Sequence, residues 1–117
     1  MLDALRQNEG CGDSVLYVFA DGPKKETDRE KVEEVRRLTD SIEGFKRVEK
    51  RYSLKNKGLA KSIIEGISEV LKEHESVIVL EDDLVTSKDF LVFMNSALEA
   101  YKERKDIWNI SGYTPPY

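Results

Sequence analysis

Three consecutive carboxylates, Glu81, Asp82 and Asp83, directly follow the apolar run 77–80. Like charges in a row repel one another, and each costs free energy if it is buried without a partner. A divalent cation reverses that balance, because Mg²⁺ and Mn²⁺ prefer oxygen ligands. Side chains alternate along an extended chain, so Glu81 and Asp83 point to one side and Asp82 to the other. The cluster therefore favours a site in which one acid holds a metal ion and another accepts a hydrogen bond from a ribose or sugar hydroxyl.

A structural role is the alternative for Asp82 and Asp83. Negative charge is favourable at the N-terminus of a helix, and a helix is expected to start near Ser87. Asp89 is better explained as the partner of Thr86 in a capping box at that helix.

Strands and helices alternate along the chain. Short apolar or extended runs predict four strands, at residues 14–20, 45–53, 76–81 and 107–113. Apolar residues at helical spacing predict helices between them, and Thr27 and Glu30 are expected to form the capping box of one. The strand at 45–53 is rich in Lys and Arg, which protect an edge strand from unwanted pairing. The expected fold is α/β, a mostly parallel, three-layer (α/β/α) Rossmann-like sheet in a single domain over residues 1–117.

Polar residues follow several of these strands. In parallel α/β sheets, ligands bind outside the carboxyl ends of the strands. Asp21 follows the strand at 14–20, and Arg51 and Lys57 lie at or just beyond the end of the edge strand. Asp21 has an alternative role as the turn-forming residue before Gly22. Arg51 and Lys57 have an alternative role as charges that keep the edge strand soluble.

Composition limits the classes of protein to consider. The 117 residues carry a net charge of −4, which argues against general nucleic-acid binding. No apolar run approaches the roughly 18 residues of a membrane span. The one cysteine, Cys11, suits a reducing cytoplasm, and peripheral attachment of a longer protein to a membrane is the alternative. The one histidine, His74, is expected to lie at the end of a helix and not to bind metal.

Four collinear segments resemble the GT-A fold glycosyltransferases, the "DxD" enzymes. Their metal-binding segment is similar to "VIVLEDDLVTSKDFLVFM", in which the Glu-Asp-Asp variant resembles inverting N-acetylglucosaminyltransferase I-type enzymes and bacterial family 2-like glycosyltransferases. Their second strand, whose terminal Asp contacts the nucleotide base, is similar to "LYVFADGPKKETDREKVEEV". The turn and helix before the metal strand resemble "NKGLAKSIIEGI", and the strand after the metal helix resembles "IWNISGY". The resemblance runs in order from about residue 2 to residue 117.

The resemblance implies a function and a set of site residues. It implies binding of a nucleoside-diphosphate sugar, with a UDP-sugar expected, and Mn²⁺ or Mg²⁺ as the cofactor. The reaction would be hexosyl or N-acetylhexosaminyl transfer to a hydroxyl acceptor. The implied metal ligand is Asp83, and the implied nucleotide-sugar ligands are Asp21, Glu81, Asp82, Arg51 and Lys57.

The chain also departs from that family. It starts at the helix that would follow the family's first strand, so a partial GT-A fold lacking that strand is expected. The acceptor half and the catalytic base are expected outside this chain, and this segment alone is expected to be an incomplete enzyme. A missing strand would leave backbone groups unpaired beside strand 14–20. We expect strand 76–81 to pair there directly, or a second copy to fill the gap and form a homo-oligomer.

Two other classes of function stay open. A non-catalytic nucleotide-binding or assembly domain is compatible with the absence of a catalytic half. A receiver-type signalling module is also acidic, α/β and of similar length. That module would need its acid pair after the first strand and a lysine after the last, and "IWNISGYTPPY" contains no lysine.

Overall fold

The chain folds into two compact units. In the computed structural model, which describes residues 1–113, 115 and 116, Ser14–Val77 forms one unit. Met1–Asp13 and the described residues from Ile78 onward form the other. We call them the strand unit and the terminal unit. None of the helices in the described ranges combines the length and the apolar character that crossing a membrane requires.

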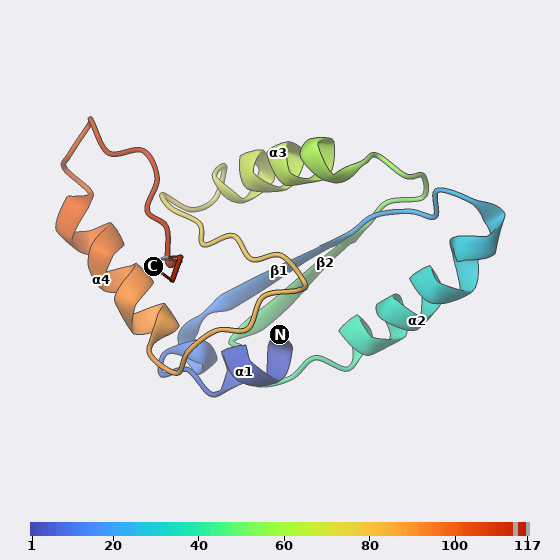
Figure 1. Cartoon of the computed structure of the whole chain (residues 1–117), viewed down its shortest axis with the longest axis horizontal. Helices are drawn as coiled ribbons and strands as arrows, with labels where there is room; N and C mark the ends of the chain where they lie inside the picture. The colour runs from blue at the N-terminus through green and yellow to red at the C-terminus, as the bar shows by residue number, and fades with distance from the viewer. Residues whose placement is uncertain (114, 117) are drawn as a thin grey trace. The chain divides into compact units, whose positions relative to one another are not determined.

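Two parallel strands make the sheet of the strand unit (Figure 1). β1 (Val15–Ala20) pairs with β2 (Arg47–Tyr52), in a register that runs from Val15 opposite Arg47 to Ala20 opposite Tyr52. β1 contains no charged residue, whereas most residues of β2 are charged. The strands predicted at 14–20 and 45–53 are therefore confirmed.

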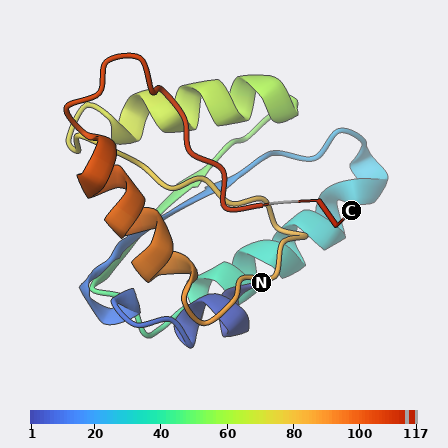
Figure 2. The same cartoon turned by 60° about the vertical axis from the view of Figure 1, so that its left-hand side comes forward.

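Helices lie on the two opposite faces of this sheet (Figures 1 and 2). α2 (Arg29–Asp40) contacts one face, where Tyr52 Oη donates a hydrogen bond to Asp40 at 3.0 Å. α3 (Leu59–Val70) contacts the other face, where Arg51 Nε lies 2.6 Å from Glu69 Oε1. Adjacent residues of a strand point to opposite faces, so Arg51 and Tyr52 are divided between the two helices. A parallel sheet with one helix on each face confirms the predicted α/β class.

The strands expected at 76–81 and 107–113 were wrong, since neither of these described segments forms a strand. A strand needs the backbone of a neighbouring strand for its hydrogen bonds. β1 and β2 pair with each other, and the described residues add no third strand to them. The expected burial is also missing, because Val79 is 47% exposed and Trp108 is 93% exposed. Direct pairing of 76–81 with β1, one of the two expectations for the gap, is therefore not observed.

The terminal unit contains α1 (Leu2–Arg6), the 3₁₀ helix η1 (Cys11–Asp13) and α4 (Phe90–Tyr101). Its buried apolar side chains are Leu5, Cys11, Leu91 and Met94. A buried asparagine, Asn8, joins the two ends of this unit. Its Oδ1 accepts the Leu91 N–H at 2.9 Å, and its Nδ2 donates to the Ser87 carbonyl at 3.0 Å.

Both predicted capping boxes were wrong. α4 begins at Phe90 with Asp89 as its N-cap, and the Asp89 side chain makes no capping bond. Asn8 instead satisfies one of the N–H groups that a helix start leaves unpaired. α2 begins at Arg29 and follows the 3₁₀ helix η2 (Glu26–Asp28), where Asp28 accepts the Lys25 N–H at 3.1 Å.

Candidate functional site

The loops at the carboxyl ends of β1 and β2 are joined by one carboxylate. Asp21 follows β1, and its Oδ1 accepts the backbone N–H groups of Gly22 and Lys57, both at 2.8 Å. Its Oδ2 accepts the Gly58 N–H at 3.0 Å. Two of the segments singled out in the sequence, "ADGP" and "NKGL", therefore meet at this end of the sheet.

Glycine at position 22 allows these two loops to touch. A Cβ there would lie 2.6 Å from the carbonyl carbon of Lys55 and 2.9 Å from that of Leu54. Both are backbone atoms that cannot rotate away. Asn56 adds a further bond by donating from Nδ2 to the Gly22 carbonyl at 3.1 Å. The carboxyl end of the sheet is thus a closely packed junction of two loops.

The environment of Asp21 keeps it ionised. Burial by itself would raise the pKa of this carboxyl. The backbone donors of Lys57, Gly22 and Gly58, together with the nearby Lys57 ammonium, outweigh burial and hold the pKa below its ordinary value. Most of its acceptor capacity is used within the chain, so the turn-forming role considered from the sequence is present in the structure.

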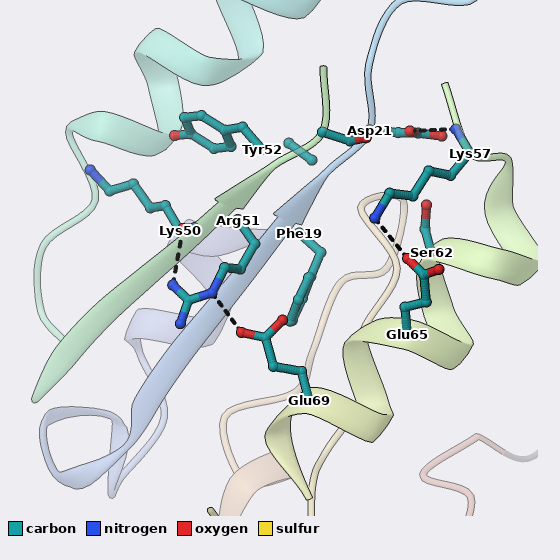
Figure 3. A pocket seen from close by; sticks show the side chains of 11 residues that line it. Phe19, Asp21, Lys50, Arg51, Tyr52, Lys57, Ser62, Glu65 and Glu69 are labelled. Carbon is teal, nitrogen blue, oxygen red and sulfur yellow. Dashed lines mark hydrogen bonds and ion pairs between the residues drawn. The ribbon is translucent and has the colours of Figure 1, made fainter. Parts of the chain in front are cut away.

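A cavity of about 450 Å³ opens beside this junction, between the ends of the strands and α3 (Figure 3). Its walls combine an aromatic ring, hydroxyl groups and charges of both signs. The residues that line it are Phe19, Ala20, Asp21, Lys50, Arg51, Tyr52, Ser53, Lys57, Ser62, Glu65 and Glu69.

The aromatic wall of the cavity depends on a glycine in α3. Phe19 projects from β1 toward α3, and its ring would lie 3.2 Å from a Cβ at position 66. Gly66 therefore lets α3 approach the sheet closely at this point. Phe19 is still 37% exposed, which leaves part of its ring for contact with a ligand.

Each cation that lines the cavity is paired with a carboxylate, and two of these carboxylates belong to α3 (Figure 3). Lys57 Nζ lies 2.7 Å from Glu65 Oε2, and this hydrogen bond raises the pKa of Lys57 and lowers that of Glu65. Arg51 Nε lies 2.6 Å from Glu69 Oε1, a contact that raises the pKa of Arg51. On the other face of the sheet, Lys50 Nζ lies 3.0 Å from Asp40 Oδ1. The charges that face the cavity are thus balanced within the protein.

Three of the residues proposed from the sequence line this cavity, namely Asp21, Arg51 and Lys57. Two further residues that line the cavity, the α3 carboxylates Glu65 and Glu69, were not predicted from the sequence. Their spacing of four residues places them on one helix face and was the available signal.

The acidic cluster lies in the terminal unit. Glu81, Asp82 and Asp83 are all exposed and belong to an irregular segment. The Leu84 N–H donates to the Glu81 carbonyl at 3.3 Å, which makes a turn through the cluster. In the part of the chain that the structure describes, no three His, Cys, Asp or Glu side chains gather to hold a metal ion.

His74 lies just beyond α3, as expected. Its N–H donates to the Val70 carbonyl at 3.0 Å, and its Nε2 lies 3.1 Å from the hydroxyl of Tyr17 on β1. Tyr17 Oη also lies 3.2 Å from Glu73 Oε2. These contacts hold the end of α3 against the sheet.

Comparison with known proteins yields no matching family model, no matching curated protein and no matching solved structure.

Proposed function

We propose that this chain is the donor-binding part of a metal-dependent glycosyltransferase, and that it binds a nucleoside-diphosphate sugar, most simply a UDP-sugar. The observation that carries the proposal is the cavity at the carboxyl ends of two parallel strands, where α/β proteins bind their ligands. The finer fold, a partial GT-A arrangement within a three-layer Rossmann-like sheet, is part of the same proposal.

The cavity supplies groups suited to a nucleotide. The exposed part of Phe19 offers a surface for a flat ring, and the hydroxyls of Ser53 and Ser62 offer polar contacts. We propose that Asp21 contacts the base. Its carboxylate would accept a hydrogen bond from the base in addition to those from the backbone N–H groups. Arg51 and Lys57 are the proposed contacts of phosphate oxygens.

Asp83 is the proposed protein ligand of Mn²⁺ or Mg²⁺, with Glu81 and Asp82 near the ribose and donor sugar. Carboxylate oxygens suit these hard cations chemically. Mg²⁺ is commonly held by one or two carboxylates together with substrate phosphates, without a cage made by the protein alone. An exposed acidic segment without a preformed three-ligand cluster is compatible with that mode. A bound cation would neutralise charge on the departing diphosphate.

A non-catalytic nucleotide-binding role is the second candidate, and one observation favours it. Each carboxylate that lines the cavity already has a partner: backbone N–H groups for Asp21, Lys57 for Glu65 and Arg51 for Glu69. General-base catalysis needs a group that is free to accept the substrate proton and lies within reach of it. The cavity is therefore better equipped to bind a ligand than to deprotonate one.

Calorimetric titration with UDP, with and without Mn²⁺, tests the proposal on the wild type and on Asp83→Asn. We expect binding by the wild type that Mn²⁺ strengthens, and loss of the Mn²⁺-dependent part in Asp83→Asn. Asp89→Asn is the matched control, because it removes one carboxylate from the same segment and should keep the Mn²⁺ response. Equal heats from all three proteins, or no heat at millimolar ligand, would reject the proposed site. Turnover of a UDP-sugar would distinguish the enzyme from the binding domain.

A further inference from the structure

Two carboxylates of α3 occupy the positions that an incoming anion would take. Glu65 and Glu69 are four residues apart on one helix face, and both point toward the cavity (Figure 3). Glu65 accepts from Lys57 at 2.7 Å, and Glu69 accepts from Arg51 at 2.6 Å. The cations suited to bind phosphate are therefore already bound to carboxylates of the same chain.

These ion pairs are solvent-exposed. The side chains of Lys57 and Glu65 are 42% and 46% exposed, and those of Arg51 and Glu69 are 42% and 41% exposed. Ion pairs at such sites contribute little net stability, because water and salt screen them. A stronger ligand such as a diphosphate can therefore replace the carboxylates without unfolding the site.

We propose that Glu65 and Glu69 act as built-in counter-anions, which a phosphate-bearing ligand must displace from Lys57 and Arg51 to enter the cavity. This inference rests on the proposed function in taking the ligand to carry phosphate groups. The two glutamates lower the affinity of the cavity for small anions in general. They thereby favour a ligand that also contacts the rest of the cavity wall, including Phe19, over free phosphate or pyrophosphate.

Titration of inorganic pyrophosphate without metal, at low salt, tests this role of α3. The variant is Glu65→Gln combined with Glu69→Gln, which keeps the helix propensity and side-chain size but removes both charges. We expect it to bind pyrophosphate about tenfold more tightly than the wild type, since two repelling charges are removed at close range. The gain should shrink as salt is raised.

The matched control is Glu30→Gln combined with Glu34→Gln on α2. This pair has the same spacing, is exposed and lies outside the cavity lining, and its replacement changes the net charge equally. It should leave pyrophosphate affinity unchanged. Adding Lys57→Gln and Arg51→Gln to the α3 variant should abolish the gain, and melting curves by circular dichroism would check that each protein is folded.

Three results would overturn the inference: no gain in the α3 variant, an equal gain in the α2 control, or no pyrophosphate binding by any of the proteins. Its failure can be told apart from failure of the proposed function. If the wild type binds UDP while the α3 variant gains nothing for pyrophosphate, only the counter-anion role fails. If the α3 variant gains affinity for pyrophosphate while no protein binds UDP, only the nucleotide proposal fails.

Discussion

Asp21 and Lys57 meet across the ends of β1 and β2, where the Lys57 N–H donates to Asp21 Oδ1 at 2.8 Å. The residues are 36 positions apart, and the same carboxylate also accepts the Gly58 N–H. The main structural role of Asp21 is therefore to hold the loop that carries Lys57. We expect replacement of Asp21 to change ligand binding partly by moving that loop.

Asp21→Asn should destabilise the protein by about 1–3 kcal/mol at neutral pH, because a charged acceptor of three N–H groups is lost. The pH dependence follows from the depressed pKa of Asp21. A carboxyl whose pKa is lower in the folded state stabilises the fold above its unfolded pKa, and that stability is lost as the pH falls through the folded pKa. The difference between wild type and variant should therefore shrink as the pH is lowered from about 5 toward 2. Urea denaturation across this range measures it, and a constant difference would contradict the role of the charge.

Gly22→Ala should destabilise the strand unit by about 1–3 kcal/mol, because its Cβ would overlap the backbone at Lys55. Gly12→Ala is the matched control, since a Cβ at position 12 would meet no atom within 4 Å. Thermal unfolding of the two variants gives the comparison. Equal melting temperatures would mean that the loops separate easily and that the junction beside the cavity is not fixed.

The strand unit could be predicted from the sequence because its signals are local. The predictions of β1, β2 and α3 rest on an apolar run, a charged edge strand and a helix with regular apolar spacing. Each of these patterns can be recognised within about ten residues. The positions of Asp21, Arg51 and Lys57 near one another then followed from the rule that parallel strands share a carboxyl edge.

The parts that could not be predicted depend on contacts between distant residues. The segment 76–81 has the composition of a buried strand, but a strand also requires a neighbour with unpaired backbone groups. The N-cap of α4 was assigned to Thr86, a residue nearby in sequence, whereas Asn8 supplies the contact from 83 positions away. Pairing of Arg51 and Lys57 with α3 likewise depends on how the helix packs on the sheet.

Asn8→Ala should destabilise the terminal unit by about 1–3 kcal/mol, because it leaves the buried Leu91 N–H without its acceptor. Asn8→Asp keeps an acceptor but cannot donate to the carbonyls of Ala4 and Ser87, so it should also be destabilising. Asn95→Ala is the control, since Asn95 is exposed and its amide donates to the Leu91 carbonyl within α4. Its effect should stay within about 0.5 kcal/mol. Denaturant unfolding of the three variants tests this, and a cost for Asn95→Ala as large as for Asn8→Ala would contradict the assignment.

The second edge of β1 leads to a prediction about association. Over the described residues, β1 pairs with β2 alone, and β1 has the uncharged composition of a strand from the middle of a sheet. Such an edge is a template for a further strand, whereas the charges of β2 oppose pairing on its own outer edge. We therefore expect two copies to associate through β1, with a sedimentation coefficient that rises with protein concentration.

Salt and hydrogen exchange can identify the edge that is used. Pairing through β1 would rest on backbone hydrogen bonds and apolar contact, so added salt should not weaken it, whereas an interface built on the charges of β2 would be screened. Those amides of Val15–Ala20 that do not donate to β2 should exchange more slowly as the concentration rises, because pairing removes them from water. A monomer at every concentration would reject association. If salt abolishes association and hydrogen exchange in β1 is unchanged, the two copies associate through a different surface. The edge of β1 would then stay open to a strand from another protein.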